Sequence, residues 1–271
     1  MHMRYQHPFH LVSSSPWPFV ASMSALLTAL GLVNWFHTTT NTCPWDILLY
    51  GVLSIMITMY FWWTDVVMEA TFLGYHTLEV QNLHRQGVIL FIVSEIMFFF
   101  SFFFAYFSSS LSPTLEIGGI WPPFGITPLD AFGIPLANTA ILLLSGISIT
   151  WAHHGLRAGN RQDVSEALLY TILLGVLFTI LQGYEYQNAP FQINDGIYGS
   201  TFYMTTGFHG FHVIIGTLFI FVMFIRHLNS HFTPTHHVGL EGAIWYWHFV
   251  DIVWILLYIT MYVWPTGYFN F

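Results

Sequence analysis

Long apolar stretches separated by short polar segments dominate this chain of 271 residues. A helix needs roughly 20 predominantly apolar residues to cross the hydrocarbon core of a bilayer. The pattern therefore predicts an all-α membrane protein with seven transmembrane helices. The third and sixth stretches have flanks that also suit a helix, so we expect those two helices to be longer and tilted. The seven predicted spans cover residues 16–36, 43–67, 87–107, 129–152, 164–186, 199–226 and 240–264.

The composition supports this prediction, because 55% of the residues are hydrophobic and only 7% are charged. Soluble domains carry roughly 25% charged residues. The chain has no lysine and a formal net charge of −8, which excludes the basic surface that nucleic-acid binding requires. Its single cysteine, Cys43, excludes an intrachain disulfide, a four-cysteine iron–sulfur site and a copper centre with two thiolates.

The arginines test the number of spans independently. With seven crossings, all of them fall on one side of the membrane, whereas one crossing more or fewer would scatter them. Basic residues gather on the cytoplasmic or matrix side, so we expect the N-terminus on that inner side and the C-terminus outside. The arginines are Arg4, Arg85, Arg157, Arg161 and Arg226.

The first residues resemble neither a cleavable signal peptide nor an Arg- and Ser-rich transit peptide. A mitochondrial protein with this start would be made inside the organelle or inserted without a presequence. We expect the mitochondrial inner membrane, with the N-terminus in the matrix and the C-terminus in the intermembrane space. A bacterial plasma membrane is the alternative.

Glu95 lies in the middle of the third apolar stretch. A carboxylate at that depth costs several kcal/mol if it is ionised and unpaired, so we expect Glu95 to be protonated or hydrogen-bonded. Two hypotheses stay open. Glu95 belongs to a proton pathway, or it makes a packing hydrogen bond to a Ser, Thr or His of a neighbouring helix.

Two further spans carry polar side chains on one helical face. His209 and His212, three residues apart, face the same way and could bind a metal or haem, but packing is favoured because no third ligand is evident. His248 and Asp251 have the same spacing, and a structural acid–imidazole pair is favoured over a proton relay. The sequence predicts no metal site.

Histidine pairs and acidic groups also lie near the predicted span ends. The pairs 153–154 and 236–237 are expected at the membrane interface, in contact with water or lipid headgroups. Glu69 lies at the inner end of the second span, shortly before His76. A phosphodiester bound between Arg226 and His76 is one specific arrangement that this topology allows.

Several motifs resemble those of cytochrome c oxidase subunit III, in the same order, from about residue 7 to residue 264. None is specific alone, but together they are highly specific. The motifs are PFHLV (8–12), SPWPF (15–19), WWTDVVMEAT (62–71), SEIMFFF (94–100), GGIWPPFGI (118–126), TWAHH (150–154), YGSTF (198–202), TGFHGFHVIIG (206–216) and WYWHFVDIVW (245–254).

The resemblance implies a two-helix group and a five-helix group with a lipid-filled cleft between them. It implies a non-catalytic subunit of the complex that reduces O2 to water and pumps protons. Haem and copper would reside in subunit I, the main contact, while subunit II takes electrons from cytochrome c and smaller subunits complete the complex. The corresponding segments are 1–15 on the inner side, 16–68 with the first two helices, 69–264 with the other five, and an outer tail, 265–271.

The resemblance also assigns residues. Glu95 matches the buried carboxylate associated with proton uptake. Phospholipid is expected to contact Trp63, Glu69, His76 and Arg226. The chain departs from the family at two positions where relatives often carry arginine, Thr64 and Met68.

Three other functions would make different demands on the sequence. Subunit III of a quinol oxidase differs mainly in its partners, so this chain says little about the electron donor. An independent haem- or copper-binding membrane enzyme would need histidines on facing helices at similar depth, and only the sixth and seventh spans place histidines within the membrane. A transporter or receptor is not favoured, because the sequence has no inverted repeat and no pair of Gly- or Pro-broken helices.

Overall fold

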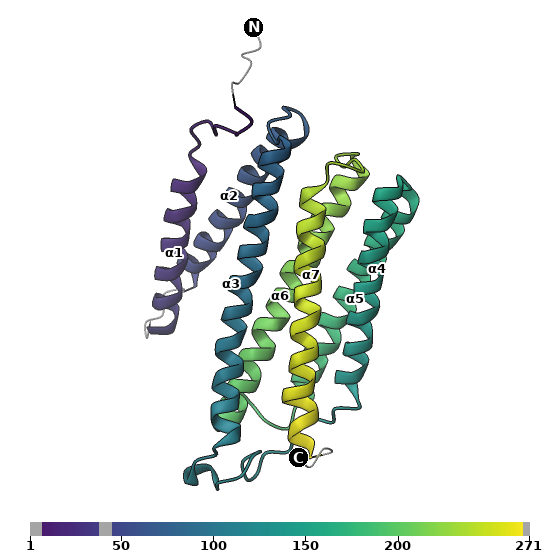
Figure 1. Ribbon diagram of the computed structural model, residues 1–271. Coiled ribbons are helices and arrows are strands. Elements are labelled where there is room, and N and C mark those ends of the chain that lie inside the picture. Colours follow the sequence, from purple (N-terminus) through teal and green to yellow (C-terminus); the bar gives the residue numbers. More distant parts are fainter. Residues whose placement is uncertain (1–6, 38–44, 268–271) are drawn as a thin grey trace. The chain divides into compact units, whose positions relative to one another are not determined.

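The computed structural model describes residues 7–37 and 45–267. Arg4, Cys43 and the end of the predicted tail, residues 268–271, fall outside these ranges. The described chain is helical and contains seven helices long and apolar enough to cross a membrane, as predicted. They are α1 (Trp17–His37), α2 (Asp46–Thr71), α3 (Leu78–Leu111), α4 (Ile134–Ala158), α5 (Arg161–Asn188), α6 (Gly196–Leu228) and α7 (Val238–Leu257), which continues through a π-helical turn (Tyr258–Val263) and a 3-10 turn (Trp264–Thr266) (Figure 1).

The two helices expected to be long are the longest. α3 has 34 residues and α6 has 33, so α3 measures about 51 Å at 1.5 Å per residue. The prediction for the fourth helix was less accurate, because α4 begins at Ile134 rather than at residue 129. Pro135 explains this start, since proline fits the first helical turn, where its missing N–H costs no hydrogen bond.

The chain divides into two compact units, Met1–Leu83 and His84–Phe271, and the boundary falls inside α3. In the first unit, α1 and α2 approach closely because each presents a glycine to the other. A Cβ on Gly31 would collide with the backbone of α2, and one on Gly51 with the backbone of α1. Small residues at such contacts allow van der Waals packing between helices inside a membrane.

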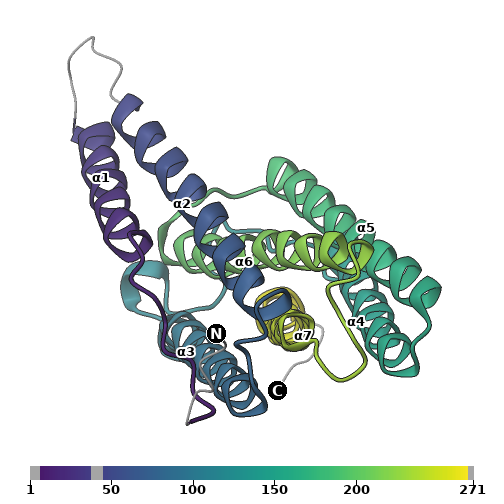
Figure 2. The same ribbon diagram turned by 90° about the horizontal axis from the view of Figure 1, so that it is seen from above.

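In the second unit, α4, α5, α6 and α7 form a closed ring in which each helix packs against the next (Figure 2). Trp247 of α7 is fully buried at the centre of this ring. Its Nε1 donates to Ser145 Oγ of α4 at 2.9 Å, and its ring lies against Gly175 of α5 and Gly216 of α6. One side chain therefore joins all four helices.

Four of the arginines lie at one end of the second unit, where α4 and α6 end and α5 and α7 begin; we call this the arginine end. Arg157 and Arg161 flank the turn between α4 and α5, and Arg226 lies in the last turn of α6. Arg85 joins them through Glu241 in the first turn of α7, with Nε and Oε2 2.7 Å apart. The gathering of the arginines that the sequence predicts is confirmed for these four.

Gly216→Ala is expected to destabilise the second unit by about 1–3 kcal/mol, the usual cost of overpacking. The added Cβ would lie 2.9 Å from the Trp247 ring and 3.2 Å from the Tyr246 ring. Gly210, on the same helix, has open space around an added Cβ, so Gly210→Ala serves as the matched control and should leave stability unchanged or slightly higher. Unfolding midpoints in detergent measure the difference, and equal midpoints for the two variants would contradict this packing.

Candidate functional site

Glu95 of α3 meets His212 of α6, with Glu95 Oε2 and His212 Nε2 2.9 Å apart. The Glu95 side chain is 22% exposed and that of His212 9%. Phe99 stands edge-on to the imidazole, with ring centroids 4.9 Å apart, and Tyr246 stacks on it at 6.2 Å. The hydrogen bond to a neighbouring helix that the packing hypothesis required is therefore present, within an aromatic surround.

The second nitrogen of His212 defines how this pair holds its proton. His212 Nδ1 lies 2.6 Å from the carbonyl oxygen of Phe208. A carbonyl only accepts, so Nδ1 carries a hydrogen and donates it. Nε2 then either accepts from a protonated Glu95 or, as an imidazolium, donates to a carboxylate. Both states place one proton between the two groups and give the pair no net charge, so neither leaves an unpaired charge within the apolar bundle.

His209 lies on the same face of α6 but contacts α7 instead of α3. Its Nε2 is 3.1 Å from the carbonyl oxygen of Val250, and its ring packs against Trp254 at 5.1 Å between centroids. The side chain is 1% exposed. His209 and His212 therefore hold α7 and α3, respectively, against α6, and neither Nε2 is available to a haem iron in this arrangement.

His248 and Asp251 both face α4, at Gly146. A Cβ on Gly146 would lie 3.1 Å from Asp251 Oδ2 and 3.8 Å from the His248 ring. His248 Nε2 is 3.3 Å from Thr150 Oγ1 of α4. Within the described ranges, no hydrogen bond joins His248 to Asp251, and Asp251 Oδ1 has no partner. The acid–imidazole pair expected from spacing is thus replaced by contacts to α4, because the neighbouring helix supplies a hydroxyl within reach.

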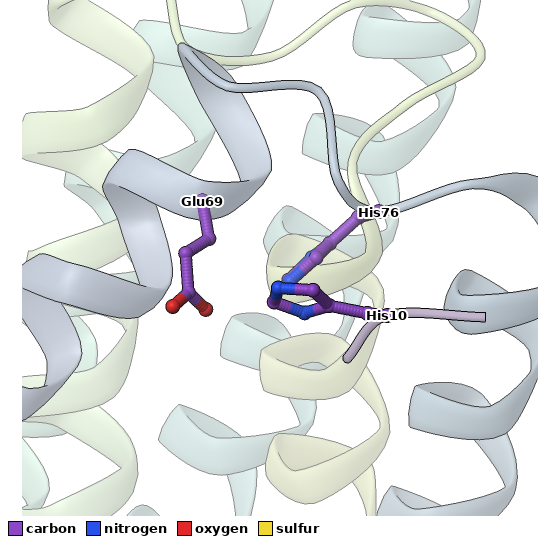
Figure 3. A group of neighbouring side chains, drawn as sticks. All are labelled: His10, Glu69 and His76. Carbon is purple, nitrogen blue, oxygen red and sulfur yellow. The ribbon is translucent and has the colours of Figure 1, made fainter. Parts of the chain in front are cut away.

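The residues expected to contact lipid fall in both units. Trp63 and Glu69 lie on α2 and His76 in the loop after it, all in the first unit, whereas Arg226 belongs to the second. Trp63 is 57% exposed. Glu69 and His76 converge with His10 of the N-terminal segment, and their ligand atoms lie within 4.8 Å of one another (Figure 3). The structure thus brings two of the four residues together and adds His10.

The N-terminal segment is fixed beside this cluster by the loop between α2 and α3. Thr77 Oγ1 donates to the carbonyl oxygen of Pro8 at 2.6 Å, and the rings of His10 and Tyr75 lie 5.1 Å apart. The acid near Glu69 on α2 has a different partner, because Asp65 Oδ2 accepts from Trp17 Nε1 at 2.5 Å. The first unit therefore gathers polar groups at the end of α2.

Arg226 lies at the arginine end beside the loop between α6 and α7. Its guanidinium carbon stands 4.7 Å from the centre of the Phe232 ring, a cation–π contact. Burial, followed by the positive charge of Arg226, lowers the pKa of His231 in this loop below its usual 6.5. His231 is therefore neutral at pH 7, and Arg226 is the cation that an anionic headgroup would meet here.

Two polar groups were missed by the sequence analysis. Glu185 of α5 is only 3% exposed; its Oε1 accepts from Tyr262 Oη at 2.6 Å and from Gln182 Nε2 at 3.2 Å. An acid within an apolar stretch, the signal that identified Glu95, would have found it. The second is the meeting of His153 with His237 and Glu241, which the sequence treated as separate interfacial groups.

Seven apolar helices, four arginines at one end of the second unit and hydrogen-bonded polar pairs between helices define a multi-spanning α-helical membrane protein. The model of the family "Cytochrome c oxidase subunit III" matches residues 7–266. The chain belongs to the cytochrome c oxidase subunit III family.

Curated relatives support the assignment along the whole match. The "Cytochrome c oxidase subunit 3" of Anopheles gambiae is 56% identical over 258 residues, which are 95% of this chain and 97% of the relative. Those of Gazella leptoceros and Damaliscus lunatus are each 55% identical over the same shares. The resemblance inferred from the motifs is therefore confirmed.

Proposed function

We propose that this chain is a core subunit of a cytochrome c oxidase, the membrane complex that reduces O2 to water while pumping protons, and that it flanks and stabilises the subunit that holds haem and copper. The observation that carries the proposal is the match over residues 7–266 to a family named for this complex. The names of the relatives favour cytochrome c over quinol as the electron donor of the complex.

The exposed apolar surface of α3 supports the proposal that this chain packs against other subunits. In its apolar window only 6% of the residues are buried, against 50% for the span Val238–Thr266. Its exposed side chains include Ile89, Leu90, Phe100 and Phe104. Lipid alone would satisfy such a surface, but a subunit that flanks a larger one needs broad apolar faces of this kind.

The same proposal places no redox centre in this chain. The histidines best placed within the membrane each contact a protein group through Nε2: His209 a backbone carbonyl, His212 Glu95 and His248 Thr150. Haem and copper are assigned to partner subunits.

The test is purification of the tagged chain in mild detergent. We expect a larger haem-bearing subunit to co-purify, and the visible haem absorption to leave with that subunit when the complex is dissociated. A chain that purifies alone and retains haem absorption would refute the proposal and favour an independent haem protein.

We also propose that the chain binds phospholipid through Trp63, Glu69, His76 and Arg226. Glu69 suits an ammonium headgroup, and Arg226 with the neutral His231 beside it suits a phosphate. Lipid bound by the residues of either unit would order the helix ends of that unit.

Arg226→Ala is expected to reduce the phospholipid that co-purifies with the complex, because it removes the phosphate-binding cation. Arg157, an exposed arginine at the same end, provides the matched control, and Arg157→Ala should leave the lipid content unchanged. Mass spectrometry of extracted lipid measures both. An identical lipid content in wild type and Arg226→Ala would remove Arg226 from the lipid site.

We propose the mitochondrial inner membrane as the location, with the arginine end in the matrix, on the basis of the positive-inside rule. In a Cys43→Ser background, Ser230→Cys at the arginine end should react with an impermeant thiol reagent only from the matrix. Leu115→Cys, at a site 93% exposed in the segment after α3, should react only from the opposite side. Reaction of both from one side would refute this topology.

A further inference from the structure

Three side chains from two helices meet at the arginine end. His153 belongs to α4, His237 immediately precedes α7, and Glu241 lies in its first turn. The nearest ligand atoms of the three lie within 4.8 Å of one another. His237 and Glu241 are four residues apart and share a helix face, and the rings of His153 and His237 stand edge to face, with centroids 5.6 Å apart.

The tautomer of His237 directs a lone pair into this cluster. His237 Nδ1 lies 3.0 Å from the backbone carbonyl oxygen of Thr233, which can only accept, so Nδ1 carries the hydrogen. In the neutral imidazole, Nε2 is then bare and points to Glu241 Oε1, 3.5 Å away. A carbonyl that accepts from the far nitrogen is the usual second-shell support of a metal-binding histidine.

Both imidazoles have a buried nitrogen that protein groups do not satisfy. Within the described part of the chain, His153 Nε2 and His237 Nε2 have no hydrogen-bond partner, although both atoms are inaccessible to solvent. His237 as a whole is only 5% exposed. Leaving such a group unpaired costs about 1–3 kcal/mol, and one ligand shared by the two nitrogens would remove both costs.

The carboxylate is held so that one oxygen stays available. Arg85 Nε binds Glu241 Oε2 at 2.7 Å, which fixes the orientation of the carboxylate and leaves Oε1 facing the histidines. The Glu241 side chain is 16% exposed. The donor set is thus two imidazole nitrogens and one carboxylate oxygen.

We propose that His153, His237 and Glu241 bind a Zn²⁺ ion that links the end of α4 to the beginning of α7. Two imidazoles favour zinc over magnesium and calcium, which prefer oxygen ligands. Three protein ligands with bonds of roughly 2.0–2.2 Å and a water in the fourth position form a common tetrahedral site. Small rotations of the three side chains bring their ligand atoms to the separation of roughly 3.4 Å that this geometry requires.

Two neighbouring arginines determine how tightly the site would hold zinc. Arg85 binds Glu241, and Arg157 lies one helical turn beyond His153. Their positive charges oppose a divalent cation and make the zinc exchangeable rather than permanent. The ion therefore adds a link between α4 and α7, which already pack against each other, and this link is lost when zinc is removed.

Adjacent histidines supply the controls for a direct test. The complex that contains this chain is stripped with a chelator, dialysed against zinc and analysed for zinc per complex by mass spectrometry. His153→Gln and His237→Gln should each hold one zinc equivalent less than wild type. His154→Gln and His236→Gln, which alter the other member of each pair, should retain the wild-type content.

Zinc content in His153→Gln and His237→Gln equal to that of wild type would overturn the proposal. If neither variant assembles, a structure of the zinc-treated wild-type complex decides, through anomalous scattering at the zinc edge. A peak between the two Nε2 atoms and Glu241 Oε1 is expected, and no peak there would refute the site. Either measurement can be made on whatever assembly the chain purifies with, so failure of the zinc site is distinguishable from failure of the proposed function.

Discussion

Trp247→Ala is expected to lower the free energy of unfolding of the unit His84–Phe271 by about 3–5 kcal/mol, the usual cost of removing a buried tryptophan. The Trp247 side chain is fully buried and contacts three neighbouring helices. The variant would leave a cavity beside Gly175 and Gly216, and glycines have no side chain that can move to fill it. The hydrogen bond to Ser145 would also be lost.

Trp151 of α4 provides a control of the same residue type, because it is 38% exposed. Trp151→Ala should change stability by about 0.5 kcal/mol or less, as surface substitutions generally do. Unfolding of the purified complex by heat or denaturant in mild detergent, followed through this chain, measures both variants. Equal losses for the two tryptophans would show that the four-helix ring does not depend on Trp247.

Glu95→Gln is expected to separate the two hypotheses for Glu95. The glutamine amide can donate to His212 Nε2 and so keep the hydrogen bond, but it cannot release a proton. If the pair serves proton uptake, Glu95→Gln should assemble with a normal haem spectrum and stability, but pump fewer protons and inactivate sooner during turnover.

Glu95→Ala adds a structural loss to that functional one. The variant leaves His212 Nε2 without its partner, which should cost about 1–3 kcal/mol, while assembly and the haem spectrum should be retained. Glu116→Gln, an exposed acid in the segment after α3, is the control for both assays. Should Glu95→Gln and Glu95→Ala match wild type in every proton and turnover assay, the pair has a packing role alone.

The sequence by itself determined the number of helices, their approximate ends and the gathering of arginines at one end of the second unit. Each of these depends on the chain locally, because an apolar stretch of sufficient length must cross the bilayer as a helix and short loops must alternate between its faces. The family was likewise evident from short motifs in order. Even the greater lengths of α3 and α6 followed from the residues that flank their apolar stretches.

Only the tertiary structure decided which polar groups meet. Glu95 and His212 lie 117 positions apart, and spacing along α6 could not show that His212 faces α3 while His209 faces α7. Likewise, spacing suggested that His248 would bond to Asp251, whereas its Nε2 contacts the Thr150 hydroxyl of α4. Such contacts depend on how each helix is rotated about its axis, and the packing of large and small side chains between helices sets that rotation. The pairing of His153 with His237 has the same origin, because the end of α4 and the beginning of α7 come together only when the ring of helices closes.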